Sequence, residues 1–150
     1  MVIALFGDSC TGKSTIAAAL APSLSAEIFS GKDYLKLAKS ESMAEALFQK
    51  KLRGEETILY VISEKDQLAL LPEGCVRVLV TAGLATIKER FAARMPGNLP
   101  APVAAMLERT YGRFETEAHD LRVDTDAVSA EEAANEIRLL LNRGERDAQN

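Results

Sequence analysis

Short apolar runs alternate along the chain with longer segments of helical periodicity. The apolar runs, which are typical of buried strands, cover residues 2–6, 26–30, 57–62, 76–81 and, more weakly, 120–123. Apolar residues recur at helical spacing over residues 13–24, 33–53, 64–71, 84–95, 103–114 and 129–141. Strands that alternate with helices predict a parallel sheet covered by helices on both faces.

Composition narrows the class of protein. The 150 residues suit one domain, and 47% hydrophobic with 27% charged residues is typical of a soluble globular protein. The net charge of −4 argues against general binding to nucleic acid or to an anionic membrane. Two cysteines cannot form a disulfide framework, which favours a reduced, cytoplasmic setting. We expect a monomer or a small homo-oligomer.

The sequence GDSCTGKST follows the first predicted strand and leads into the first predicted helix. It satisfies the phosphate-loop (Walker A) pattern G-x-x-x-x-G-K-[ST], in which glycines let several backbone N–H groups point at one anion and the helix N-terminus adds positive charge. Lys13 would reach the β- and γ-phosphates of ATP, and the Ser14 hydroxyl would ligate Mg²⁺. ATP and Mg²⁺ are therefore the predicted cofactors. The predicted nucleotide-binding residues are Gly7, Asp8, Ser9, Cys10, Thr11, Gly12, Lys13, Ser14 and Thr15.

Other classes of phosphate-loop protein fit less well. The guanine-reading and switch motifs N-K-x-D and D-x-x-G are absent, and a large mechanical ATPase needs a longer chain. A small phosphotransferase remains, and it requires an acceptor site, a metal-organising carboxylate and cationic side chains near the phosphates.

The chain resembles the small P-loop kinases, which include nucleoside monophosphate, shikimate and gluconate kinases and chloramphenicol phosphotransferase. The resemblance is sharpest in GDSCTGKST and weaker in FSGKDYLKLAK, LATIKERFAARM, MLERTYGRF and VDTDAVSAEEAANEI. It implies a three-layer P-loop NTPase fold: a five-stranded parallel sheet, a helical acceptor-binding insert at about 33–54 and a short lid at about 95–102. A polar tail would follow at 143–150.

Two carboxylates follow predicted strands. In many of the kinases that this chain resembles, an aspartate at the position of Asp33 orients the acceptor hydroxyl or a Mg²⁺-bound water. Its other interpretation is a cap on the helix that follows. Glu64 stands where a second metal-organising carboxylate would lie, although the usual aspartate is missing there. Its other interpretation is a first-turn glutamate favoured by the helix dipole.

Arginines flank the predicted lid. Arg90 and Arg94 are four residues apart on one predicted helix, and Arg109 and Arg113 are four apart on the next. Guanidinium groups on a closing lid would stabilise the transferred phosphoryl group, and Arg94 and Arg109 are the first candidates. The alternative is a solvated helix face paired with neighbouring glutamates.

These residues predict an ATP-dependent small-molecule kinase that transfers the γ-phosphoryl group to a hydroxyl or phosphate acceptor, such as a nucleoside or nucleotide. Its predicted catalytic residues are Lys13, Asp33, Arg94 and Arg109. The acceptor itself is not identified, because the insert lacks the acceptor motifs of adenylate and shikimate kinases. Two other hypotheses stay open: a catalytically weak nucleotide-binding regulatory module, and a slow NTPase.

Overall fold

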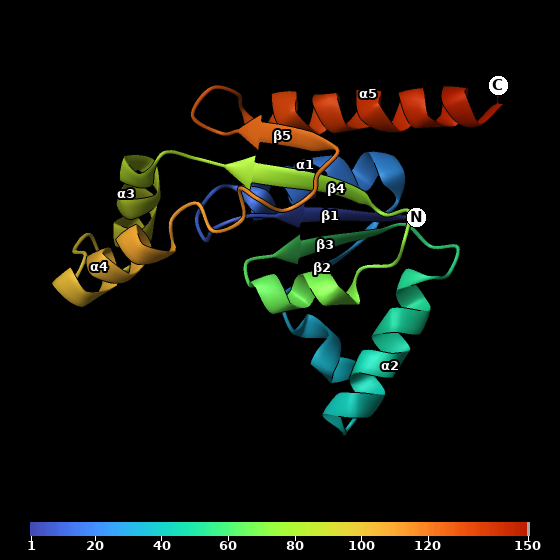
Figure 1. Cartoon of the computed structure of the whole chain (residues 1–150), viewed down its shortest axis with the longest axis horizontal. Coiled ribbons are helices and arrows are strands. Elements are labelled where there is room, and N and C mark those ends of the chain that lie inside the picture. The colour runs from blue at the N-terminus through green and yellow to red at the C-terminus, as the bar shows by residue number, and fades with distance from the viewer. Residues whose placement is uncertain (150) are drawn as a thin grey trace.

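Five parallel strands form the central sheet of the computed structural model, which describes residues 1–149 (Figure 1). Their order across the sheet is β2-β3-β1-β4-β5. This arrangement confirms the predicted parallel sheet with helices on both faces. The strand bounds are β1 Val2–Phe6, β2 Glu27–Ser30, β3 Ile58–Ile62, β4 Val76–Thr81 and β5 Leu121–Asp124.

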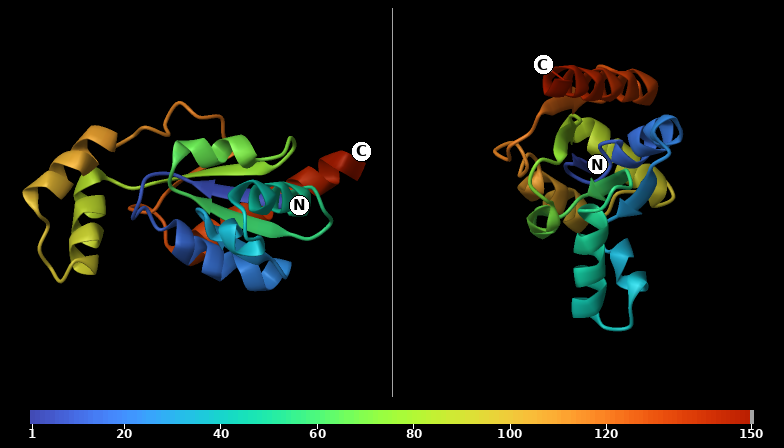
Figure 2. Two further views of the ribbon diagram at one scale, coloured as in Figure 1. Left: turned by 90° about the horizontal axis from the view of Figure 1, so that it is seen from below. Right: turned by 90° about the vertical axis from the view of Figure 1, so that its right-hand side faces the viewer.

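Helical segments connect the strands and cover both faces. The helices α3 and α4 project beyond the carboxyl end of the sheet, and α2 projects away from its β2 edge (Figures 1 and 2). Within residues 1–149, no helix is both long and apolar enough to cross a membrane. The bounds, with η for 3₁₀ helices, are α1 Lys13–Leu24, η1 Asp33–Leu37, α2 Glu41–Leu52, η2 Lys65–Leu70, α3 Leu84–Arg94, α4 Ala101–Thr110 and α5 Ala130–Gln149.

The central strand β1 contributes side chains to two separate cores. Val2, Ala4 and Phe6 belong to a buried cluster that includes aromatic residues of η1 and α2. Ile3 and Leu5 belong to a second cluster that includes apolar residues of α1 and α5. Successive side chains of a strand point to opposite faces, so one uninterrupted apolar run supports both outer layers.

Three predicted segments differ from the structure. The helix predicted over residues 33–53 is divided into η1 and α2, because the Ser40 hydroxyl caps α2 by accepting the N–H of Met43 at 3.2 Å. The helix predicted over 103–114 ends at Thr110, because Gly112 takes a left-handed backbone conformation (φ +78°). The predicted polar tail at 143–150 continues α5 through Gln149, and residue 150 lies outside the described residues.

The carboxyl ends of the strands meet at one edge of the sheet. The glycine-rich segment of residues 7–12 follows β1, and Asp33, Glu64 and Thr125 lie shortly after β2, β3 and β5. Ligands of open α/β sheets bind outside the carboxyl ends of the strands. The fold therefore places the predicted phosphate loop and both predicted carboxylates at this edge.

Candidate functional site

The glycine-rich segment turns sharply between β1 and α1. Gly7 has φ +156°, Gly12 has φ +102° and Cys10 has φ +65°. A Cβ atom on Gly7 would lie 2.2 Å from the carbonyl oxygen of Val80 in β4, a distance that real Cβ atoms do not reach. Glycine at position 7 therefore lets this loop pass directly against the neighbouring strand.

Lys13 fills the inside of the loop with a positive charge. Its side chain is buried, and its Nζ donates hydrogen bonds to the carbonyl oxygens of Gly7 at 2.9 Å and Asp8 at 2.5 Å. The Thr11 hydroxyl oxygen lies 3.4 Å from the same nitrogen. Burial lowers the pKa of Lys13 to about 8, against the opposing charge of Asp8. An ammonium group encircled by a turn of backbone is suited to an anion that can replace those oxygens.

This pKa predicts a pH dependence of nucleotide binding. A bound polyphosphate raises the pKa of Lys13, because it favours the charged ammonium. Below about pH 8 Lys13 is already protonated, whereas above pH 8 the free protein has lost the proton and binding must take one up. The affinity of the loop for a polyphosphate should therefore fall above pH 8, by at most about tenfold per pH unit. Calorimetric titration at pH 7, 8 and 9 in buffers of different ionisation enthalpy measures the affinity and the number of protons taken up on binding.

The control for this prediction is Cys10→Ser, which replaces another side chain of the same loop and keeps Lys13. This variant should keep the pH dependence, and Lys13→Ala should lose it. An affinity that stays constant from pH 7 to 9 in the unmodified protein would contradict the role of Lys13 in binding the phosphates.

Thr125 and Arg90 hold the loop from its outer side. The Thr125 hydroxyl donates to the carbonyl oxygen of Thr11 at 2.7 Å. Arg90 Nη1 donates to the carbonyl oxygen of Cys10 at 3.1 Å and to the Thr125 hydroxyl oxygen at 3.2 Å. Arg90, a predicted lid residue, thus braces the loop here. The sequence analysis missed Thr125, although a polar residue directly after β5 lies at the ligand-binding edge.

A second network joins the loop to the turn after α4. Asp8 Oδ2 accepts the N–H of Gly112 at 2.9 Å, and Arg113 Nε lies 3.7 Å from Asp8 Oδ1. Arg113 also forms an ion pair with Glu64 at 3.5 Å. Arg113 therefore lies beside the loop. It does not share a helix face with Arg109, contrary to prediction, because α4 ends at Thr110.

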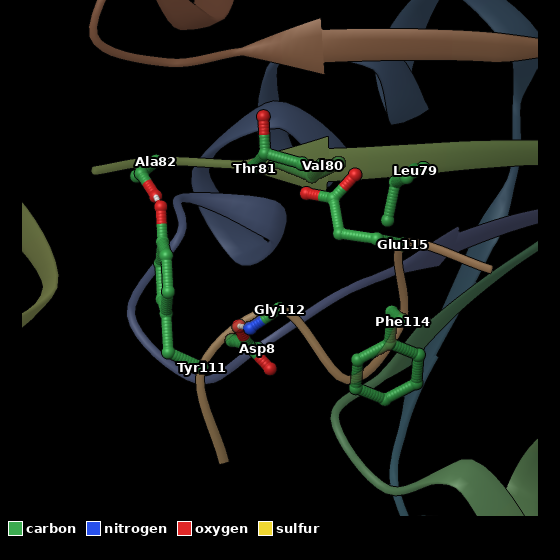
Figure 3. Close-up of a pocket in the computed structure, with 9 residues that line it drawn as sticks. All are labelled: Asp8, Leu79, Val80, Thr81, Ala82, Tyr111, Gly112, Phe114 and Glu115. Atoms are coloured by element: carbon green, nitrogen blue, oxygen red, sulfur yellow. Dashed lines mark hydrogen bonds between the residues drawn. The ribbon is translucent and has the colours of Figure 1, made fainter. Parts of the chain in front are cut away.

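The turn after α4 is also hydrogen-bonded to the residue that follows β4. The Tyr111 hydroxyl donates to the carbonyl oxygen of Ala82 at 3.0 Å, while Gly112 contacts Asp8 (Figure 3). Between these contacts and Phe114 lies a cavity of about 10 Å³, which has room for one water molecule at most. This cavity is a packing gap, and larger openings on either side of the loop offer space for ligands.

Two such openings flank the loop. A cleft of about 520 Å³ lies between the start of α1, α3 and the start of α5, and Thr15, Arg94 and Ser129 are among its lining residues. A smaller pocket of about 90 Å³ is lined in part by Ser9 and Arg113. The larger volume lies within the 300–1,000 Å³ range of small-molecule sites.

The remaining predicted site residues are exposed and make few contacts with the loop. Asp33 is exposed, and its Oδ2 accepts the N–H of Ser30 at 3.0 Å, so it stabilises the turn between β2 and η1; no side chain caps η1. Ser14 is exposed in the first turn of α1. Arg109 is exposed on α4. Over residues 1–149, no three His, Cys, Asp or Glu side chains converge on a metal site.

Neither a protein-family model nor a curated protein sequence matches this chain. Solved structures do. A gluconokinase from Sinorhizobium meliloti aligns over 97% of this chain and 96% of its own, with a TM-score of 0.63 and 19% identity. The YorR protein from Bacillus subtilis, in complex with phosphorylated GDP, covers 97% and 98%, with a TM-score of 0.69 and 22% identity.

A shikimate kinase from Acinetobacter baumannii in complex with shikimate aligns over 95% of this chain and 93% of its own, with a TM-score of 0.67 and 15% identity. Alignments of this extent cover the sheet, the helices and the segments between them. At these identities the likeness concerns the fold. The chain has the fold of the small P-loop kinases.

Proposed function

We propose that the chain is an ATP-dependent small-molecule kinase, which transfers the γ-phosphoryl group of Mg·ATP to a hydroxyl or phosphate acceptor. The observation that carries this proposal is the buried Lys13 ammonium, which is held inside a glycine turn at the start of α1. The fold shared with a gluconokinase and a shikimate kinase supports it.

The nucleotide would occupy the 520 Å³ cleft and the loop together. Its base and ribose would lie in the cleft near Arg94, and its phosphates would replace the carbonyl oxygens that now bind Lys13. Ser14, exposed beside the loop, would ligate Mg²⁺, with Glu64 acting through water. The metal ion, when bound, neutralises charge on the β- and γ-phosphate oxygens.

In the transfer step, an acceptor hydroxyl oxygen forms a bond to the γ-phosphorus while the bond from that phosphorus to the bridging oxygen breaks. ADP leaves with the electron pair, and the hydroxyl proton passes to the Asp33 carboxylate. Arg94 and Arg109, on the two sides of the connection 95–100, would approach the phosphoryl group when the lid closes. Arg113 is already beside the loop through Asp8.

Replacing Asp33 with asparagine separates the two roles of this residue. Asparagine keeps an oxygen that can accept the N–H of Ser30, but it cannot take a proton. We expect acceptor-dependent kcat to fall by about 10²–10⁴-fold, with the dissociation constant for ATP unchanged. Steady-state kinetics and calorimetry measure the two quantities. Transfer that survives within a few-fold would leave Asp33 with only its structural hydrogen bond to Ser30.

The function itself is tested by ADP release in a screen of hydroxyl-bearing metabolites, nucleosides and nucleoside monophosphates. A kinase releases ADP faster with one of them and yields its phosphorylated product. ADP release that no acceptor accelerates would favour the slow NTPase. Nucleotide binding without turnover would favour the regulatory module, and the absence of binding would overturn all three.

A further inference from the structure

Three consecutive residues in the turn after α4 contact the segments that follow three adjacent strands. The Tyr111 hydroxyl donates to the backbone after β4, and the Gly112 N–H donates to Asp8 after β1 (Figure 3). Arg113 Nη2 donates to the carbonyl oxygen of Ser63, directly after β3, at 2.5 Å. These strands are neighbours in the sheet, in the order β3-β1-β4. The turn therefore holds the Arg113 guanidinium at the ligand-binding edge, between the end of β3 and the phosphate loop.

The Asp8 carboxylate joins this turn to the phosphate loop. Its Oδ2 accepts the Gly112 N–H at 2.9 Å, and its Oδ1 lies 3.7 Å from Arg113 Nε. The Asp8 side chain is 16% exposed, whereas the side chain of Glu64, which pairs with Arg113 at 3.5 Å, is 60% exposed. Water and salt screen charges at exposed side chains, so Asp8 attracts the guanidinium more strongly than Glu64 does.

Asp8 also contacts Lys13, the other cation beside the loop. The Asp8 carbonyl oxygen accepts Lys13 Nζ at 2.5 Å, while the Asp8 carboxylate pairs with Arg113. Burial is the main reason that the pKa of Lys13 falls to about 8, and the positive charge of Arg113 lowers it further, against Asp8. An anion that meets both cations would be bound by an ammonium and by a planar guanidinium, which suits phosphate oxygens.

The space beside Arg113 can hold a phosphate group. The pocket of about 90 Å³ next to the loop is lined in part by Asp8, Ser9 and Arg113, and this volume equals about three water molecules. Asp8 Oδ1 and Arg113 Nε have no hydrogen-bond partner among residues 1–149, because the 3.7 Å between them is too long. A phosphate oxygen that approaches the guanidinium therefore competes with an attraction between charges, and it breaks no hydrogen bond at Nε.

We propose that Asp8 is a positioning residue, which holds Arg113 so that the guanidinium contacts the terminal phosphate of the nucleotide and the phosphoryl group during transfer. This inference rests on the proposed kinase function. In the transfer step the acceptor oxygen bonds to the γ-phosphorus as the bond to the bridging oxygen breaks, and ADP keeps the electron pair. Arg113 stabilises the charge on the other phosphoryl oxygens. Arg94 and Arg109 depend on closure of the lid, whereas the contacts of Arg113 already place it beside the loop.

The variant Asp8→Asn separates positioning from a simple effect of charge. Asparagine keeps an oxygen that can accept the Gly112 N–H, so the turn should stay in place, but its neutral side chain no longer attracts Arg113. A carboxylate beside phosphates repels them, so charge alone predicts that Asp8→Asn tightens the binding of the terminal phosphate. Positioning predicts the opposite result, because Arg113 is released.

Calorimetry in the presence of Mg²⁺ compares ADP with AMP-PNP, a non-hydrolysable analogue of ATP. The ratio of the two affinities reports the contacts to the terminal phosphate. Arg113→Ala should lower this ratio by about tenfold, the effect of losing one hydrogen bond between charged groups. Asp8→Asn should lower it by about three- to tenfold, and in the Arg113→Ala background it should lower it no further. A ratio that Asp8→Asn leaves unchanged or raises, a ratio that Arg113→Ala does not change, or equal losses in both backgrounds would overturn the inference.

The matched control is Asp120→Asn. The Asp120 carboxylate also accepts a backbone N–H, that of Arg77 at 2.8 Å, but at the opposite end of β4. This variant removes the same charge and should leave the affinity ratio unchanged, and a loss as large as that in Asp8→Asn would overturn the inference. The thermal unfolding midpoint checks that each variant folds. If Asp8→Asn does not fold, Asp8→Ser, which also lacks the charge and carries an oxygen, should show the same fall in the ratio.

Steady-state kinetics separate this inference from the proposed function. With the best acceptor from the screen, Asp8→Asn should lower kcat by about tenfold and leave the KM of the acceptor unchanged. If the affinity ratio falls as expected but no acceptor accelerates ADP release, the kinase function fails and Asp8 stands as a positioning residue for the terminal phosphate. If an acceptor accelerates ADP release equally in Asp8→Asn and in the unmodified protein, the kinase function stands and the inference fails.

Discussion

Replacing Lys13 with alanine is expected to lower the turnover of ATP by at least about 10²–10³-fold, the effect of removing one preorganised charge-stabilising donor. The ammonium is the buried cation at the centre of the phosphate loop, and it already binds two loop carbonyl oxygens at 2.9 and 2.5 Å. Its loss removes the charge that meets the β- and γ-phosphates. The kcat and KM for ATP, with the best acceptor from the screen, measure the effect.

The fold should survive this change. Burying the Lys13 ammonium opposes folding, as its lowered pKa indicates, so alanine also removes a desolvation cost. Thermal unfolding checks this point. The control is Lys50→Ala, which removes an exposed lysine from α2 at the same change in net charge. Equal kcat/KM in Lys13→Ala and the unmodified protein would refute the phosphate-binding role of the loop.

Replacing Gly7 with alanine is expected to disturb the loop through its backbone. The new Cβ would lie 2.2 Å from the carbonyl oxygen of Val80, which is a main-chain atom of β4, and the backbone of residue 7 fixes the position of that Cβ. Neither can move without displacing β4 or the loop, so we expect a loss of about 1–3 kcal/mol in the free energy of unfolding. Nucleotide affinity should fall as well, because the backbone N–H groups no longer converge.

The chain offers a matched control for this change. Gly144 lies within α5, and a Cβ there would meet no atom within 4 Å. Gly144→Ala should therefore stabilise the protein by about 0.5–1 kcal/mol, the difference between the two residues inside a helix. Urea unfolding compares both variants at constant m-value. A Gly7→Ala protein as stable as the unmodified one would contradict the described packing of the loop against β4.

Local patterns account for most of what the sequence predicts correctly. The strands appear as continuous apolar runs because the parallel sheet is buried on both faces, and the glycines of GDSCTGKST mark the sharp turn between β1 and α1 because Gly7 and Gly12 take positive φ values there. The split at Ser40 was also local, since a hydroxyl three residues before an amide donor is a capping pattern. Helical periodicity continues on both sides of Ser40, which is why the sequence predicts one uninterrupted helix there.

Contacts between distant segments could not be predicted in this way. Asp8 binds Gly112, and Thr125 binds Thr11, across more than a hundred residues of sequence in each pair. No periodicity relates these positions. They meet because parallel strands bring their carboxyl ends to one edge, and which side chains pair there depends on turn conformations such as that of Gly112.

The contacts of Arg90 determine where the chain can bend if the proposed lid closes. Arg90 bonds the Cys10 carbonyl and the Thr125 hydroxyl together, so α3 is anchored to the phosphate loop at this residue. A swing of the whole of α3 would pull on the loop and break both bonds. Closure that keeps both hydrogen bonds must bend the chain after Arg90. The segment that moves is then the last turn of α3, which contains Arg94, together with the connection 95–100. Only this short segment would then move. The distance that Arg94 can cover is limited because Arg90 stays bound to the loop.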